Sequence, residues 1–172
     1  MYKVTGTDNV VPLPDLPQSS IGAPMPVIVA GELDLLIAFY LQDTPSDWNG
    51  ETVRVVSKES ENETVCIVHF NRCYAHLFGP PNDEAFSGHP LNKHGLKPYG
   101  SYEILNSSWL HELEIMNSVH PYHVKGEFLK GKRHIVLTFH DSTLECIAES
   151  YTFSISVGSV CRMVASMGER LR

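Results

Sequence analysis

The stretch HIVLTFHDSTLECIAESYTF, residues 134–153, decides the fold. Two apolar segments flank the triplet His140-Asp141-Ser142, and Asp and Ser in such a position favour a turn because their side chains bond the nearby backbone. We therefore predict an antiparallel hairpin of 134–139 with 143–153. If the tip of this hairpin is at Asp141-Ser142, Phe139 pairs with Leu144. The same register pairs Leu137 with Cys146, which gives an apolar face, and leaves on the other face Thr138, His140, Thr143 and Glu145.

Further strands are predicted on both sides of a central loop. Residues 27–42 alternate between two sets of side chains, which indicates one strand, although the Leu, Ala and Glu content of 32–41 also fits a helix. Residues 52–58 and 64–78 form a second predicted hairpin, joined by the charged segment 59–63. A turn is expected at 43–50, which contains Asn49-Gly50. Residues 101–105 form a short predicted strand.

Two short helices are predicted, at about 107–119 and 157–171. Asn106-Ser107-Ser108 supplies an N-cap for the first helix, and Pro121 ends it. The second has an apolar stripe of helical period, formed by Val160, Met163, Val164, Met167 and Leu171. The fold class is therefore α+β, mainly antiparallel β, with a curved sheet or partial barrel and these two helices. Residues 1–26 hold five prolines and form an extended N-terminal arm, while 27–172 form a single globular domain.

The composition excludes several classes of protein. The net charge of −7 argues against nucleic-acid binding, which requires a basic face. No apolar run approaches the roughly 20 residues of a membrane helix, so no membrane partner is expected. The four cysteines form no CxxC pair, and the N-terminus lacks the apolar core of a signal peptide. These features predict a cytoplasmic protein with reduced cysteines. A small-molecule ligand is expected at the pocket described below, and a homodimer is left open.

The segment FGPPNDEAFSGHPLNKHGLKPYG, residues 78–100, is the predicted edge of a functional site. Its four prolines and four glycines exclude a regular helix or a central strand. Long irregular segments in compact domains are uncommon, and the ordered ones are usually functional. The apolar residues Phe86, Leu91 and Leu96 indicate that this loop is pressed against the sheet.

Histidine and carboxylate side chains in the loop and the hairpin are the candidate acid–base groups. A histidine beside a carboxylate transfers protons near neutral pH, because the carboxylate fixes the tautomer and supports the charged form. The candidate catalytic residues are Asp83, Glu84, His89, His140 and Glu145. The alternative is structural: Asp83 belongs to an Asx turn, the loop histidines bond carbonyl groups, and His140-Asp141 is a solvent-exposed turn.

A divalent metal is a second hypothesis for the same region. His69, His76 and His89 are the candidate ligands, since imidazole binds zinc, iron and manganese. The spacing is not diagnostic, because no HExxH motif is present and His69 and His76 face opposite sides of an ideal strand.

Two functions follow from these patterns. The first is a small-molecule enzyme of lyase, isomerase or hydrolase type, which uses His/carboxylate acid–base chemistry, with or without a metal, at a pocket between the 78–100 loop and the 134–148 hairpin. The second is a non-catalytic cytoplasmic binding or toxin-neutralising protein whose acidic surface meets a basic partner. The sequence leaves open whether the protein is an enzyme, and it identifies neither the substrate nor the reaction.

Overall fold

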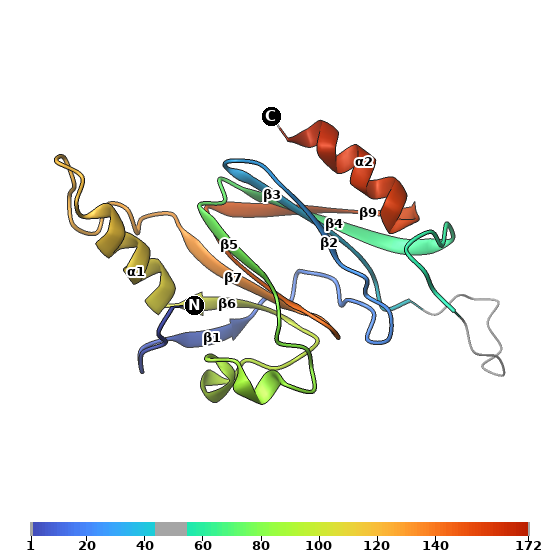
Figure 1. The fold of residues 1–172 in the computed structure, drawn as a ribbon, viewed down its shortest axis with the longest axis horizontal. Coiled ribbons are helices and arrows are strands. Elements are labelled where there is room, and N and C mark those ends of the chain that lie inside the picture. Colours follow the sequence, from blue (N-terminus) through green and yellow to red (C-terminus); the bar gives the residue numbers. More distant parts are fainter. Residues whose placement is uncertain (1, 44–54, 172) are drawn as a thin grey trace.

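The strands form two antiparallel sheets that pack face to face (Figure 1). The computed structural model describes residues 2–43 and 55–171. Within these residues, one sheet has five strands in the order β1-β6-β7-β8-β5, and the other has four in the order β2-β3-β4-β9. The strands of the five-stranded sheet are β1 (Asn9–Pro12), β5 (Ala75–Gly79), β6 (Ser101–Leu105), β7 (Arg133–Thr138) and β8 (Thr143–Ala148). Those of the four-stranded sheet are β2 (Val27–Ala30), β3 (Asp34–Tyr40), β4 (Glu63–Asn71) and β9 (Ser150–Gly158).

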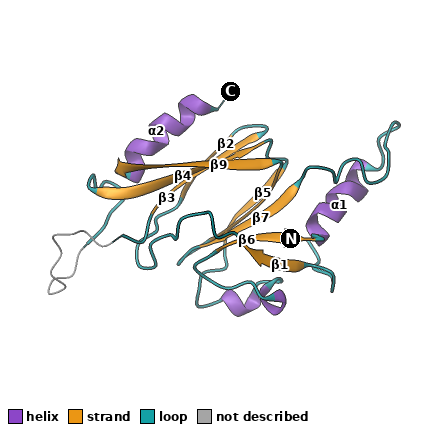
Figure 2. Ribbon diagram, turned by 180° about the vertical axis from the view of Figure 1, so that it is seen from behind, coloured by secondary structure: helices purple, strands orange, loops and turns teal. Residues whose placement is uncertain are grey.

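Each sheet is covered on its outer face as well as on its inner face (Figure 2). The main core lies between the sheets and contains the Phe39–Phe139 ring contact at 5.2 Å. Helix α2 (Val160–Arg170) covers the four-stranded sheet through Val160 and Met167. Helix α1 (Ser108–Asn117) and the 78–100 loop, with its short 3-10 turns Phe86–Gly88 and Asn92–His94, cover the five-stranded sheet. The β7 and β8 side chains that point away from the main core are therefore buried as well.

Both long predicted strands break where the chain passes from one sheet to the other. Segment 64–78 divides into β4 and β5, and segment 143–153 divides into β8 and β9. Asn71 pairs with Ser150 and Ala75 pairs with Ile147, so one segment has one more residue than the other at this corner. The extra residue makes a β-bulge, in which Arg72 adopts a φ of +51°. Because of this bulge, one long ribbon contributes to both sheets.

The prediction of one continuous strand over 27–42 is wrong. It is a β2–β3 hairpin with a turn after Ala30, and Gly31 N–H donates to the Asp34 carbonyl across that turn. The helical alternative for 32–41 is also wrong. Residues 44–50 of the predicted turn and 52–54 of the predicted strand 52–58 lie outside the described residues, and the described remainder of that strand, 55–58, is not a strand. Strand β4 pairs instead with β3 and β9.

The 134–153 hairpin has the predicted faces in a shifted register. Leu137 pairs with Leu144 rather than with Cys146, because the turn spans Phe139 to Ser142 and Phe139 N–H donates to the Ser142 carbonyl. The shift of two residues preserves which side chains share a face. Accordingly, the four predicted apolar residues, Leu137, Phe139, Leu144 and Cys146, are buried together in the main core.

The strand-rich α+β class and the two helices are confirmed, and the sheets do not close into a barrel. Ser107 Oγ accepts the Leu110 N–H and caps α1, and Ser159 caps α2 in the same way. Helix α2 begins later than predicted, because Val157 extends β9. Within 2–43 and 55–171, the helices are too short or too polar to cross a membrane.

Candidate functional site

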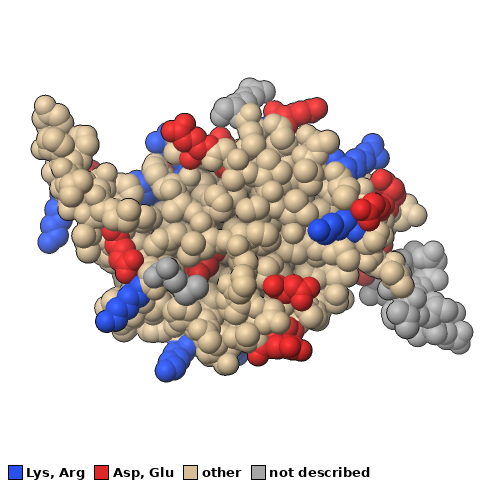
Figure 3. Space-filling model, viewed as in Figure 1, with Lys and Arg blue, Asp and Glu red and all other residues tan. Residues whose placement is uncertain are grey.

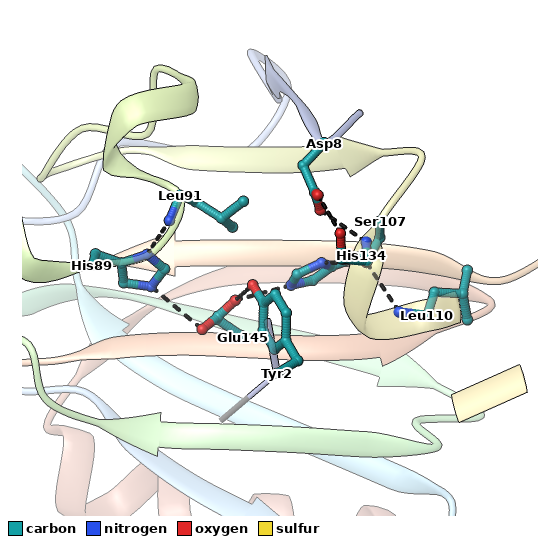
Figure 4. A network of polar contacts seen from close by, with 9 residues as sticks. Tyr2, Asp8, His89, Leu91, Ser107, Leu110, His134 and Glu145 are labelled. Carbon is teal, nitrogen blue, oxygen red and sulfur yellow. Dashed lines mark hydrogen bonds and ion pairs between the residues drawn. The ribbon is translucent and has the colours of Figure 1, made fainter. Parts of the chain in front are cut away.

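Five polar side chains meet beneath the covering loop on the outer face of the five-stranded sheet (Figure 4). Glu145 comes from β8, His134 from β7 and His89 from the loop. Ser107 caps α1, and Tyr2 comes from the N-terminal segment. All five are buried, and the two histidines and Glu145 are at most 3% exposed. We call this group the Glu145 network.

The hydrogen bonds of the Glu145 network fix the tautomers of both histidines. Leu91 N–H donates to His89 Nδ1 at 3.1 Å, so the remaining proton lies on Nε2, which is 3.3 Å from Glu145 Oε1. His134 Nε2 lies 3.1 Å from Glu145 Oε2, and its Nδ1 lies 2.9 Å from Ser107 Oγ. Since Ser107 Oγ already accepts the Leu110 N–H, its hydroxyl is free to donate to His134. Each imidazole therefore donates to the carboxylate.

Glu145 is the anion at the centre of this network. Burial raises the pKa of the carboxyl, but the hydrogen bonds from His134, His89 and Tyr2 outweigh burial and bring it from 4.5 to about 2. Tyr2 Oη donates to Glu145 Oε2 at 2.5 Å, while burial and the adjacent carboxylate raise the pKa of Tyr2. Glu145 is therefore a fixed carboxylate at neutral pH.

The order Ser107–His134–Glu145 has the residue types of a nucleophile, a base and an orienting acid. The hydroxyl group, however, caps α1, and Ser107 is 3% exposed. The stacked rings of Tyr2 and Trp109, whose centroids lie 5.4 Å apart, both contact the His134 ring. Every polar atom of the three side chains has a partner within the network. The arrangement therefore joins the N-terminal segment, the loop and α1 to the sheet.

A second cluster lies at the surface, where the loop meets the β7–β8 turn. Asp83 N–H donates to the His140 carbonyl at 2.9 Å, which fixes the loop to the turn. Tyr99 Oη donates to Asp83 Oδ2, and Glu84 N–H donates to Asp83 Oδ1. His140 Nδ1 lies 3.0 Å from Asp141 Oδ1 and 3.9 Å from Asp83 Oδ1. We call Asp83, Tyr99, His140 and Asp141 the His140 cluster.

A cavity of about 490 Å³ adjoins this cluster. Tyr99 lines it, and so do Thr138 and Phe139, which directly precede His140. Its opposite wall is the proline-rich segment 12–19, and Gln18 Nε2 donates to the Tyr99 carbonyl at 2.9 Å. Cavities of this size hold small molecules. The lining of this one mixes apolar side chains, such as Leu16 and Phe39, with polar ones, such as Gln18 and Thr138. Tyr99 has a φ of +58°, a conformation that costs a non-glycine residue on the order of 1 kcal/mol and is concentrated at functional sites.

The charges of the His140 cluster shift the pKa of Asp83, Tyr99 and His140. The hydrogen bond from Tyr99 lowers the pKa of Asp83, and the same bond raises the pKa of Tyr99 to about 12. The Asp141 carboxylate, with further contributions from Asp83 and Glu84, raises the pKa of His140 from 6.5. Within the part of the chain that the structure describes, Nε2 of His140 has no hydrogen-bond partner, and the side chain is 41% exposed. This nitrogen is open to a ligand.

The five candidate catalytic residues fall into two groups. Asp83 and His140 meet in the His140 cluster, and Glu84 is an exposed neighbour that acts on His140 through its charge. His89 and Glu145 instead meet inside the protein, in the Glu145 network. The predicted packing of the loop against the sheet is confirmed, because Phe86, Leu91 and Leu96 are at most 3% exposed.

The three candidate metal ligands lie on separate elements. His69 is on β4, with Nε2 2.8 Å from Asp34 Oδ1, whereas His76 is on the exposed strand β5 and His89 is in the loop. Across residues 2–43 and 55–171, no group of three or more His, Cys, Asp or Glu side chains is arranged to hold a metal ion. The structure therefore gives the metal hypothesis no support.

Sequence reasoning missed Tyr2 and Tyr99, and it treated His134 and Ser107 only as strand and cap residues. The orientation of His134 could have been predicted from the sequence. Side chains alternate between the two faces of a strand, and in the predicted hairpin this alternation places His134 on the same face as Glu145, away from the main core. Tyr2 contacts a residue 143 positions away, and no local pattern predicts such a contact. Comparison of the chain with protein families, with curated proteins and with solved structures found no match.

Proposed function

We propose that the protein is a small-molecule enzyme of lyase, isomerase or hydrolase type in which His140 is the general acid–base residue. The observation that carries this proposal is the position of Tyr99, which lines the 490 Å³ cavity and also donates to Asp83 beside His140. A substrate in the cavity would contact Tyr99, whose ring centroid lies 6.3 Å from that of His140, a histidine of raised pKa. Proton transfer by a positioned histidine contributes typically 10²- to 10⁴-fold to a rate.

Each residue of the cluster has a distinct role in this proposal. Nε2 of His140 exchanges the proton with the substrate. Asp141 and Asp83 face Nδ1, so they orient the ring and stabilise its charged form. Tyr99 stays protonated at neutral pH, because its pKa is about 12, and it holds Asp83 in place.

The surrounding charge favours neutral or cationic substrates. Asp83, Glu84 and Asp141 all act on His140, and the chain has a net charge of −7, so an anionic substrate would be repelled. The alternative of an acidic surface that binds a basic protein receives less support. On the face drawn in Figure 3, the acidic side chains are interspersed with Lys and Arg and do not form one patch.

The test is a turnover screen of neutral and cationic small molecules, monitored by NMR. Compounds that bind wild-type protein should be converted, and His140→Gln should reduce turnover by about 10²-fold or more. The matched control is His111→Gln, which removes an exposed histidine of α1 and should leave turnover unchanged. Gln18→Trp at the cavity wall should raise KM more than it lowers kcat, because it obstructs the cavity and not the histidine.

The pH profile distinguishes a catalytic histidine from a structural one. Because Asp141 raises the pKa of His140, Asp141→Asn should move the corresponding limb of the pH–rate profile to lower pH. Full turnover in His140→Gln would contradict the proposal. Compounds that bind in the cavity and are never converted would favour the non-catalytic alternative.

A further inference from the structure

Strand β9 is an open sheet edge nine residues long. It lies beside β4 at the margin of the four-stranded sheet (Figure 2). Among the residues that the structure describes, no strand pairs with its other side. Helix α2 lies on the outer face of the sheet, mainly against β2 and β3, and its hydrogen bond with β9 is made through the Ser156 side chain rather than through the backbone edge. Alternate N–H and C=O groups along β9 are therefore available to another strand.

The sequence of β9, SYTFSISVG, has none of the features that keep edge strands apart. Natural edges are usually short, charged, interrupted by proline or a bulge, or covered. Strand β9 has no charged residue and no proline. Its apolar side chains continue the inner face of the sheet, where Phe153 pairs with Val68 and Ile155 with Cys66. They are nevertheless exposed, by 40% at Phe153, 51% at Ile155 and 68% at Val157.

We propose that β9 pairs antiparallel with β9 of a second copy of this chain, with Ser154 on the two-fold axis. This register uses all nine residues, since Ser150 then faces Gly158 of the second copy. It places Phe153 opposite Ile155 and Tyr151 opposite Val157, so that the apolar side chains meet on one face. The serines and Thr152 meet on the other face. The two four-stranded sheets become one continuous sheet of eight strands.

The charges near the edge fit a second copy. No like charges meet along the strand, although each chain has a net charge of −7. Arg133 lies over the Tyr151 ring and Asp15 accepts from Tyr151 Oη, so the first end of β9 carries both signs. At the other end, near Gly158, Glu61 and Arg162 likewise supply one negative and one positive charge. A two-fold axis brings these two ends together, and opposite charges can then pair.

The mass of the full chain in solution gives the first test. Light scattering after size exclusion should give a dimer, twice the 19.2 kDa of one chain. Ile155→Lys places a charge on the edge and should give a monomer, whereas Met116→Lys, which adds the same charge at a similarly exposed position of α1, should stay dimeric. A wild-type monomer would overturn the proposal and leave the edge to a strand of another protein.

Cysteine cross-linking tests the register, in a Cys161→Ser background that removes the exposed native thiol. Residues directly opposite in antiparallel strands have Cα atoms about 5 Å apart, within disulfide range. With oxidised glutathione as the oxidant, Ser154→Cys should therefore cross-link to itself. Thr152→Cys alone should not, because its copies lie about 13 Å apart, but it should cross-link when mixed with Ser156→Cys. A dimer that cross-links in neither case, or that survives Ile155→Lys, would overturn the pairing.

Discussion

Replacing Glu145 with glutamine removes the one anion of the buried network while nearly preserving its shape. The carboxylate accepts from Tyr2, His134 and His89, and all four side chains are at most 7% exposed. Glutamine keeps one acceptor oxygen, but its NH₂ group must face at least one of these donors. Glu145→Gln should therefore leave a buried donor without an acceptor, which is costly.

The pKa of Glu145 sets the magnitude. A carboxyl whose pKa falls from 4.5 to about 2 on folding contributes about 3 kcal/mol at neutral pH. Because the folded value is the lower one, this contribution is fully present above pH 4.5. It is lost as the pH falls toward 2. We expect Glu145→Gln to lower the free energy of unfolding by about 3 kcal/mol at pH 7 and by progressively less at acid pH.

Urea denaturation at a series of pH values from 7 to about 2 measures both effects. The matched control is Glu32→Gln, which removes the same charge from an exposed position and should change stability by no more than about 0.5 kcal/mol. The reasoning is refuted if Glu145→Gln is as stable as wild type at pH 7. It is equally refuted if the stabilities of the two proteins run parallel between pH 4.5 and 2.

Two further predictions concern the main core. Phe139→Ala should lower the free energy of unfolding by about 3 to 5 kcal/mol in urea denaturation, because this ring is 1% exposed and contacts Phe39; Tyr122→Ala, at 87% exposure, is the control, and a similar loss in both variants would contradict the packing. Thiol titration of the native protein should detect Cys161 alone, and denaturation should release three more thiols, since all four cysteines are free and the other three are buried. Rapid reaction of a second thiol in the native state would show that the corner near Cys73 opens.

The sequence predicted which side chains are apolar more reliably than where strands begin and end. Both sheets are covered on both faces at their central strands, so β3 and β8 are buried along almost their whole length. In such strands the residues that face either side of the sheet are apolar. The hydrophobic pattern therefore does not show where one strand ends and the next begins. For that reason 64–78 was predicted as one strand, although the chain turns from one sheet to the other at Arg72. A non-glycine residue at positive φ gives no local signal for such a corner.

In the candidate site as well, local sequence patterns identified some residues, whereas contacts between distant segments were not predicted. Asp83 and His140 were assigned to one site because the 78–100 loop and the 134–148 hairpin were expected to form a common pocket, and the structure brings the two side chains together. Tyr99 was not predicted as a site residue, since its role depends on the cavity wall formed by segment 12–19, far away in the chain. His89 was expected to be open to a substrate. It is instead 3% exposed and bonded at both ring nitrogens, because Leu91 and Phe86 bury the loop around it.

Strand β9 differs from the covered strands because polar and apolar residues alternate along its sequence. It alternates serine or threonine with an aromatic or aliphatic residue from Ser150 to Val157, which is the pattern of a strand with one face buried. In the single chain, that apolar face is about half exposed at Phe153 and Ile155. The proposed strand pairing would reduce this exposure, because it adds apolar neighbours beside Phe153 and Ile155. Pairing with a second β9 also places the alternating residues of one copy against the same alternation in the other.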